Sequence, residues 1–200
     1  MNSNIKVIFF DVGNTLLFPN RERIHVPLAK QGFVPDGEHL RDLECRTKNR
    51  FDGMMASVTK GTGSTDQGFW WMFYSQLLSE IGLNDVAIRD QLVASIGNSA
   101  NWDAIRPGTA EQLHEIGKRY PVAVISNADG KIENVLSRCG TADCFRTITD
   151  SGLVGYGKPH PEIYRQALTS MNAAPEESLY AATSIPWTTS APRAQARRRC

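Results

Sequence analysis

The sequence contains few cysteines, no long apolar segment and almost no net charge. Its four cysteines form no CxxC pair and stand near no group of histidines, which argues against a zinc site and against a disulfide framework. The formal net charge of +1 favours neither nucleic acid nor an anionic membrane as a partner. A transmembrane helix needs about 20 apolar residues, and we find no such segment and no secretion signal. We therefore expect a cytoplasmic protein with one core domain and a small insertion in its 200 residues.

Short apolar segments alternate with amphipathic ones at the start of the sequence and again after residue 105. Residues 6–10 and 121–125 are rich in β-branched and aromatic residues, as in strands that are buried on both faces of a parallel sheet. The other candidates are residues 145–148 and 178–180 for strands, and residues 107–120, 132–136 and 161–168 for helices. This alternation predicts an α/β fold with a doubly wound parallel sheet.

Residues 20–105 break this alternation, because their apolar residues mostly recur with helical periodicity. Amphipathic stretches at 71–81 and 86–96 follow a glycine-rich stretch at 60–64. One helical stretch carries an aromatic cluster that could line a substrate pocket, although aromatic residues at helical spacing more often belong to the core. The members of this cluster are Trp70, Trp71, Phe73 and Tyr74.

These segments predict three parts in the chain. Residues 1–19 and 106–180 would form the core domain, and residues 20–105 a small helical cap domain inserted into it. Residues 181–200 contain four arginines and two prolines but no Asp or Glu, and their composition suits neither a strand nor a helix. We therefore predict an aberrant or disordered tail over residues 181–200.

Three polar side chains stand at or just after the ends of the predicted strands. Asp11 follows the first strand, Ser126 follows the second, and Lys158 lies in the loop after the third. Open parallel sheets bind ligands outside the carboxyl ends of their strands. A carboxylate there can form a covalent intermediate, while a hydroxyl and an ammonium hold an anionic group and offset its charge. A lone Asp after a strand is usually a cap or turn residue, but the three residues together favour covalent catalysis on a small molecule.

Three motifs in this order resemble those of the haloacid dehalogenase-like hydrolase superfamily. FFDVGNTLL resembles the first motif, a buried strand that ends in DxDxT, and VAVISN resembles the second. GYGKPHPEIY is similar to the third motif, with its Lys-Pro pair in place. The resemblance implies a Rossmann-type core with a helical cap, and a hydrolase that attacks its substrate with an aspartate.

The resemblance also implies a role for each matching residue. Asp11 would be the nucleophile, and Lys158 would steady both this nucleophile and the developing charge. Thr15 would position the catalytic loop beside the substrate. Ser126 and Asn127 would bind the group that is transferred.

The resemblance further implies a magnesium site, with one departure from the family pattern. The family's phosphatases bind Mg²⁺ through the nucleophile, a backbone carbonyl two residues on and an acid from a fourth motif, so the first two ligands here would be Asp11 and Gly13. The same phosphatases carry a second Asp, a general acid and base, where this sequence has Gly13. Loss of a positioned proton donor costs about 10²–10⁴-fold in rate. The family's dehalogenases also lack that Asp, because a halide leaves without a proton. Alternatively, Gly13 permits a tight turn.

The fourth motif of the family, a strand that ends in GDxxxxD, is absent after residue 180. We infer that the tail is translated out of frame. Trp187 is encoded by TGG and Thr188 by ACN, so a shifted frame reads GAC, an aspartate, across their boundary. In the same frame, the codons of residues 181–183 allow Gly and Asp with the spacing of the motif. The alternative is a divergent or disordered natural tail. Nucleotide sequencing around codon 180 decides between the two.

Three functions are compatible with these residues. The first is a Mg²⁺-dependent phosphatase of a small phosphorylated metabolite that works through an aspartyl-phosphate. The second is a dehalogenase of 2-haloacids, which Gly13 favours. The third is a non-catalytic relative that serves as a binding module. With residues 181–200 as they stand, we expect weak Mg²⁺ binding, impaired activity and a loosely packed chain, which a sharp thermal transition would contradict.

Overall fold

The structure, a computed structural model, describes residues 5–33, 37–58 and 66–182. The glycine-rich stretch at 60–64 and the tail from residue 183, with its inferred change of reading frame, lie outside the described residues. The chain divides into two compact units at Asn20 and Trp102. The first unit contains the described residues before Arg21 and after Asn101, and the second contains the described residues between these boundaries.

The first unit is built on a four-stranded sheet in the order β5-β4-β1-β6, and every neighbouring pair is parallel. Its strands are β1 (Val7–Phe10), β4 (Val122–Ser126), β5 (Ile148–Asp150) and β6 (Ser178–Ala181). Phe10 pairs with Val124 of β4 on one side and with Ala181 of β6 on the other. The predicted α/β fold with a parallel sheet is therefore confirmed.

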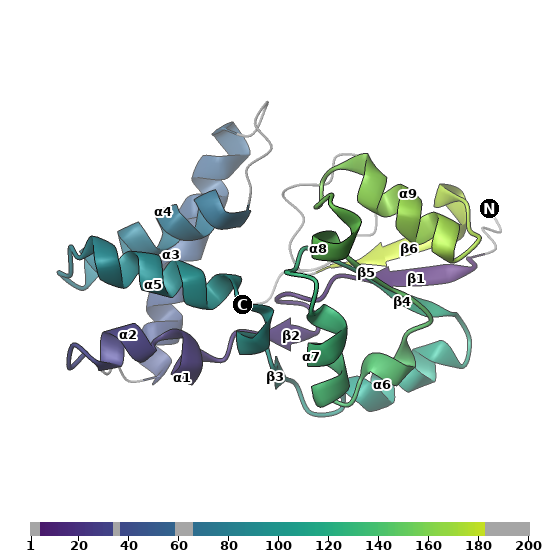
Figure 1. The fold of residues 1–200 in the computed structure, drawn as a ribbon, viewed down its shortest axis with the longest axis horizontal. Helices are drawn as coiled ribbons and strands as arrows, with labels where there is room; N and C mark the ends of the chain where they lie inside the picture. Colours follow the sequence, from purple (N-terminus) through teal and green to yellow (C-terminus); the bar gives the residue numbers. More distant parts are fainter. Residues whose placement is uncertain (1–4, 34–36, 59–65, 183–200) are drawn as a thin grey trace. The chain divides into compact units, whose positions relative to one another are not determined.

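Helices cover both faces of this sheet (Figure 1). The helices α6 (Thr109–Gly117) and α7 (Ile132–Arg138) pack on one face, and α9 (Pro161–Ser170) packs on the other. Successive residues of a strand point to opposite faces, so Val7 and Phe9 join the core under α9 while Ile8 and Phe10 pack against the core under α6 and α7. The sheet is thus buried on both sides, which explains the continuous apolar composition of β1 and β4.

A short two-stranded sheet joins the two ends of the inserted segment within the first unit. Its strands, β2 (Leu17–Phe18) and β3 (Ala104–Ile105), are antiparallel. Beside it, the Asn20 amide donates a hydrogen bond of 3.0 Å to the Asp103 carboxylate. The chain therefore leaves the first unit and returns to it at neighbouring positions, as expected for an insertion that folds as a separate unit.

The described residues of the second unit are mostly helical, and the predicted cap over residues 20–105 stays a prediction. Its helices are α1 (Arg21–Ile24), α2 (Val26–Ala29), α3 (Gly37–Val58), α4 (Asp66–Glu80), α5 (Val86–Gly97) and η1 (Ser99–Asn101). Phe73 and Tyr74 are buried in its core, whereas Trp71 is 46% exposed and lies under the guanidinium of Arg89. The aromatic cluster is therefore core at two of its positions. Among the described helices of the chain, we find none with the length and apolar character to cross a membrane.

The third strand of the core begins later than the sequence predicted. The pattern predicted a strand over residues 145–148, but β5 spans Ile148–Asp150. A short 3₁₀ helix, η2 (Ala142–Cys144), precedes this segment, and the Phe145 side chain turns into the core under α6 and α7. Phe145 is thus a residue of the kind that strands favour, but here it lies before the strand and still packs into the core.

Glycine at position 152 allows two loops of the core to approach each other closely. Gly152 lies in α8 (Ser151–Val154), and a Cβ there would meet the backbone nitrogen of Gly130 and lie 2.6 Å from the carbonyl carbon of Asp129. These are backbone atoms, so relief requires a shift of the whole loop. We expect Gly152→Ala to lower the free energy of unfolding by about 1–3 kcal/mol in urea titrations. Gly117→Ala is the control, because nothing lies within 4 Å of its added Cβ. Equal midpoints for the two variants would contradict the prediction.

Candidate active site

The Asp11 carboxylate lies at the carboxyl end of the central strand β1. The backbone N–H of Asp11 donates to the carbonyl of Ala181 over 2.9 Å, which ties this end of β1 to the neighbouring strand β6. The chain then turns sharply, and the N–H of Thr15 donates to the carbonyl of Val12 over 3.1 Å. This turn brings the Thr15 hydroxyl to 3.4 Å from Oδ2 of Asp11, to which it donates a long hydrogen bond. Thr15 therefore contacts the predicted nucleophile itself.

The Lys158 ammonium has a bonding partner for each of its three hydrogens. Nζ lies 2.5 Å from Oδ1 of Asp11 and 3.0 Å from both the Ile125 carbonyl oxygen and the Tyr180 hydroxyl oxygen. The side chains of the Lys158–Asp11 ion pair are 15% and 17% exposed, so solvent screens their charges only in part. The structure thus brings together the two residues that the sequence predicted to be catalytic, although 147 positions separate them.

The Asn127 side chain holds the backbone of Lys158 in place. Its Oδ1 accepts a 2.6 Å hydrogen bond from the Lys158 N–H, and its Nδ2 donates a 3.0 Å hydrogen bond to the Lys158 carbonyl. The neighbouring Gly157 leaves room for this contact, because a Cβ there would lie 3.2 Å from Oδ1 of Asn127. The predicted contact of Asn127 with substrate stays a prediction, and its amide is engaged in positioning Lys158.

Ser126 is the last residue of β4 and lies at the same edge of the sheet as Asp11. It is 3% exposed, since β4 runs between β1 and β5. Asp150, at the end of β5, holds the loop that follows Ser126. The buried Asp150 carboxylate accepts hydrogen bonds from the N–H groups of Gly130 (3.1 Å), Ile132 (3.1 Å) and Gly152 (2.9 Å). The first two bonds hold the loop after the second motif, and the third caps the helix that follows Asp150.

Tyr180 is a residue of the site that the sequence did not reveal. Tyr180 lies in β6 and is the register partner of Phe9 in β1. Its hydroxyl accepts a hydrogen bond from Lys158. Burial, and to a lesser extent the negative charge of Asp11, raise the pKa of the Tyr180 phenol, so it stays neutral at physiological pH. No local motif marks such a residue. The strand register decides that it faces the lysine.

Gly13 is not needed for the backbone conformation of the turn after Asp11. The left-handed residue of this turn is Asn14, with φ at 58°, and Gly13 is not among the glycines with positive φ. The interpretation that Gly13 serves to permit the turn is therefore wrong. A Cβ at this position would lie 3.5 Å from the ring of Trp102, which is an ordinary van der Waals distance. An added Cβ therefore meets no clash here.

The described residues do not reproduce the magnesium site that the resemblance implied. In the described part of the chain, the group of three side chains close enough to share an ion is His114, Asp143 and Cys144, and Asp11 belongs to no such group. One carboxylate oxygen of Asp11 is already bound to Lys158. The tail contains no Asp or Glu to supply the third ligand. Mg²⁺ in proteins usually has one or two carboxylate ligands and several waters. Without the third ligand, the Asp11 carboxylate and the Gly13 carbonyl would hold the ion weakly.

The family model for haloacid dehalogenase-like hydrolases matches residues 5–181. The chain is similar to haloacid dehalogenase-like hydrolase domain-containing protein 3 of Xenopus laevis, with 24% identity over 192 residues that cover 88% of this chain and 75% of that protein. The same protein of Bos taurus is 28% identical over 177 residues, which cover 82% and 68% of the two chains.

Two solved structures illustrate the likeness in fold. YfnB, a hydrolase of Bacillus subtilis bound to magnesium, has a TM-score of 0.67 at 16% identity, over 92% of this chain and 80% of that one. The L-2-haloacid dehalogenase of Xanthobacter autotrophicus, with chloropropionic acid covalently bound, has a TM-score of 0.56 at 17% identity, over 88% and 69% of the two chains. At identities this low, the likeness shows a shared fold and nothing about substrate or activity.

Proposed function

Because the chain belongs to the haloacid dehalogenase-like hydrolases, we propose that it hydrolyses a small phosphorylated metabolite through an aspartyl-phosphate on Asp11. The contact between the Asp11 carboxylate and the Lys158 ammonium is the observation that carries this proposal. It puts a nucleophile and a fixed positive charge at the carboxyl edge of a parallel sheet, where ligands bind in folds of this kind. Ser126 ends the adjacent strand and is the proposed partner for oxygens of the transferred group.

The proposed reaction has two steps. In the first, an oxygen of Asp11 forms a bond to phosphorus while the bond from phosphorus to the leaving oxygen breaks, and that oxygen keeps the electron pair. Lys158 lies beside the attacking carboxylate and offsets the negative charge of the phosphoryl group in the transition state. In the second step, water attacks the phosphorus and loses a proton to solvent, while the bond from phosphorus to the Asp11 oxygen breaks and inorganic phosphate leaves. Asp11 regains its carboxylate.

We also propose that Mg²⁺ binds weakly or not at all to the chain with residues 181–200 as they stand. The Mg²⁺ dependence of the family's phosphatases rests on an acid that this chain does not supply, and the magnesium bound to YfnB belongs to that protein. Lys158 then provides the main positive charge beside Asp11. Isothermal titration with Mg²⁺ tests this proposal, and a dissociation constant in the micromolar range would contradict it.

Hydrolysis of a 2-haloacid is the second candidate, and Gly13 favours it. Here an oxygen of Asp11 would bond to the carbon that bears the halogen, and the halide would leave with its electron pair and without a proton. Water would then attack the carboxyl carbon of the resulting ester, whose bond to the substrate oxygen breaks. The 2-hydroxy acid leaves with a proton of the water, the other proton goes to solvent, and Asp11 regains its carboxylate. This chemistry requires neither the second acid nor a magnesium ion.

Product analysis in water enriched in heavy oxygen distinguishes the two candidates. The full chain is incubated with para-nitrophenyl phosphate or with chloropropionic acid, with and without Mg²⁺, and phosphate and chloride are measured. On the phosphatase route the heavy oxygen enters phosphate, whereas on the dehalogenase route it enters the Asp11 side chain, where mass spectrometry detects it. Chloride release without phosphate release would replace the first candidate by the second. If a folded chain released neither phosphate nor chloride, the result would favour a non-catalytic binding protein.

Gly13→Asp is expected to restore the missing proton donor. Phenolates leave without help, but alkoxides need a proton, so the unaltered chain should hydrolyse aryl phosphates far better than alkyl phosphates. A Cβ at position 13 would be in ordinary van der Waals contact with the Trp102 ring, so the first atom of the new side chain meets no clash. We expect Gly13→Asp to raise kcat/KM for an alkyl phosphate by about 10²–10⁴-fold, with little change for an aryl phosphate. Gly13→Asn is the matched control, and an equal gain in both variants would contradict this role.

A further inference from the structure

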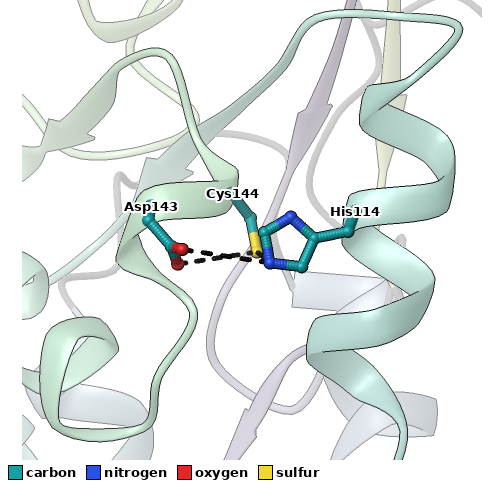
Figure 2. A group of neighbouring side chains, drawn as sticks. All are labelled: His114, Asp143 and Cys144. Atoms are coloured by element: carbon teal, nitrogen blue, oxygen red, sulfur yellow. Dashed lines mark hydrogen bonds and ion pairs between the residues drawn. The ribbon is translucent and has the colours of Figure 1, made fainter.

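A second group of metal-ligating side chains lies in the first unit, on elements that do not contribute to the Asp11 site. His114 comes from α6, and Asp143 and Cys144 come from η2. Figure 2 shows the three side chains converging on one point between these elements. Nε2 of His114 lies 3.6 Å from Sγ of Cys144 and 3.9 Å from Oδ2 of Asp143, and Sγ lies 4.0 Å from Oδ1 of Asp143.

The separation of 3.6 Å between Sγ of Cys144 and Nε2 of His114 matches that around a tetrahedral zinc ion. Zn²⁺ lies about 2.3 Å from a thiolate sulfur and about 2.0–2.2 Å from an imidazole nitrogen or a carboxylate oxygen, so its tetrahedral ligand atoms lie about 3.3–3.6 Å apart. The distances from His114 and Cys144 to Asp143 run to different carboxylate oxygens. With one ligand atom from each residue, the three atoms lie within 4.8 Å of one another, which is wider than around a bound ion. The His114 and Asp143 side chains are 52% and 74% exposed, so they are free of core packing and can rotate toward an ion.

The backbone that carries these ligands is held in place by the core. Leu113, next to His114, is buried in the cluster under α6 and α7, and so is Phe145, next to Cys144. The N–H of Cys144 donates to the carbonyl of Thr141 over 3.2 Å, and Thr141 is itself buried. The ligands are therefore brought together by the fold itself, which lowers the entropic cost of binding an ion.

We propose that His114, Asp143 and Cys144 bind one Zn²⁺ ion at the surface of the core, with water in the fourth position. The ligand types select this metal, because thiolate and imidazole suit zinc, whereas Mg²⁺ and Ca²⁺ prefer oxygen ligands alone. The exposed sides of His114 and Asp143 give the ion a path from solvent. Bound zinc would link the end of α6 to η2, two elements that belong to the same core cluster.

The proposed zinc site lies at the opposite edge of the sheet from Asp11. The end of α6 leads into the start of β4, and η2 leads into the start of β5, so both elements lie near the amino ends of these parallel strands. Asp11 and Ser126 lie at the carboxyl ends. Zinc at this site would therefore stabilise the core and take no part in the proposed hydrolysis, and the two proposals fail independently.

Titration of the full chain with Co²⁺ tests this proposal, after reduction of the thiols and removal of metals with a chelator. Co²⁺ replaces Zn²⁺ in such sites, and a thiolate ligand gives a charge-transfer band in the near ultraviolet. We expect one Co²⁺ per chain, displacement of Co²⁺ by Zn²⁺, and a rise in the melting temperature with Zn²⁺. His114→Gln, Asp143→Asn and Cys144→Ser should each weaken Zn²⁺ binding by about tenfold or more.

Cys139→Ser is the matched control for this titration. The Cys139 thiol lies 3.6 Å from the Asp103 carbonyl and belongs to no group of ligands in the described residues, so its loss should leave the charge-transfer band unchanged. Absence of the band in the unaltered chain, or an equal band in Cys144→Ser, would overturn the proposal. Asp143 is an exposed residue, so Asp143→Asn tests the site without a risk to folding.

Discussion

Asp11→Asn is expected to reduce hydrolysis of para-nitrophenyl phosphate by on the order of 10⁴-fold or more, as removal of a covalent nucleophile does in other hydrolases. The amide of asparagine is a far weaker nucleophile than a carboxylate and cannot form the mixed anhydride with phosphate. The substitution also removes the negative partner of the Lys158 ammonium. Steady-state kcat/KM and trapping of the phosphorylated chain by mass spectrometry measure the effect.

The matched control for this prediction is Asp42→Asn. Asp42 lies on α3, is 65% exposed and forms a surface ion pair with Arg46, which contributes little to stability. The urea midpoint of Asp11→Asn shows whether the variant is folded. If a folded Asp11→Asn chain kept its activity within about tenfold, Asp11 would not be the nucleophile.

Lys158→Met is expected to lower kcat by about 10²–10³-fold, the loss that follows removal of one preorganised group that stabilises charge in a transition state. Methionine keeps most of the length and packing of the lysine side chain but removes the charge beside Asp11. Lys158→Arg is expected to recover little activity, because a planar guanidinium does not reproduce three bonds from a single nitrogen.

Two further variants serve as comparisons for Lys158→Met: Tyr180→Phe, a milder change at the site, and Lys118→Met, a change on the surface. Tyr180→Phe removes one acceptor of the ammonium and keeps its charge, so we expect a loss of about tenfold or less. Lys118→Met removes an exposed lysine that pairs with Glu115 on the surface, and kcat should not change. Equal kcat values for Lys158→Met and Lys118→Met would show that the charge at position 158 does not assist the reaction.

The parts of the fold that the sequence predicted are those marked by local composition. A strand buried on both faces must be apolar throughout, so β1 and β4 stand out from the helices around them. Phe145 misled the prediction of β5, because a bulky apolar residue is equally suited to a strand and to a turn that is buried from one side. Of the two interpretations of Gly13, the tight turn is wrong, since the left-handed residue of the turn is Asn14.

The position of Asp11 and Lys158 at one edge of the sheet followed from the sequence, because each stands after a strand and the carboxyl ends of parallel strands meet at the same edge. The two hydrogen bonds between the Asn127 side chain and the Lys158 backbone did not follow from the sequence, although both residues belong to the motifs described above. Such a bond depends on the exact path of two loops that no local pattern describes. Asp150, which supports one of these loops, was missed for the same reason.

The amino-acid sequence alone determined which segments are buried in the sheet, which family the chain resembles and which two charged groups meet at the sheet edge. These properties depend on composition and on the order of the strands. Tertiary structure alone decided that Tyr180 faces Lys158 and that His114 meets Cys144, two residues 30 positions apart. Both contacts depend on the register of strands and the packing of helices, which bring together residues that share no pattern in the sequence.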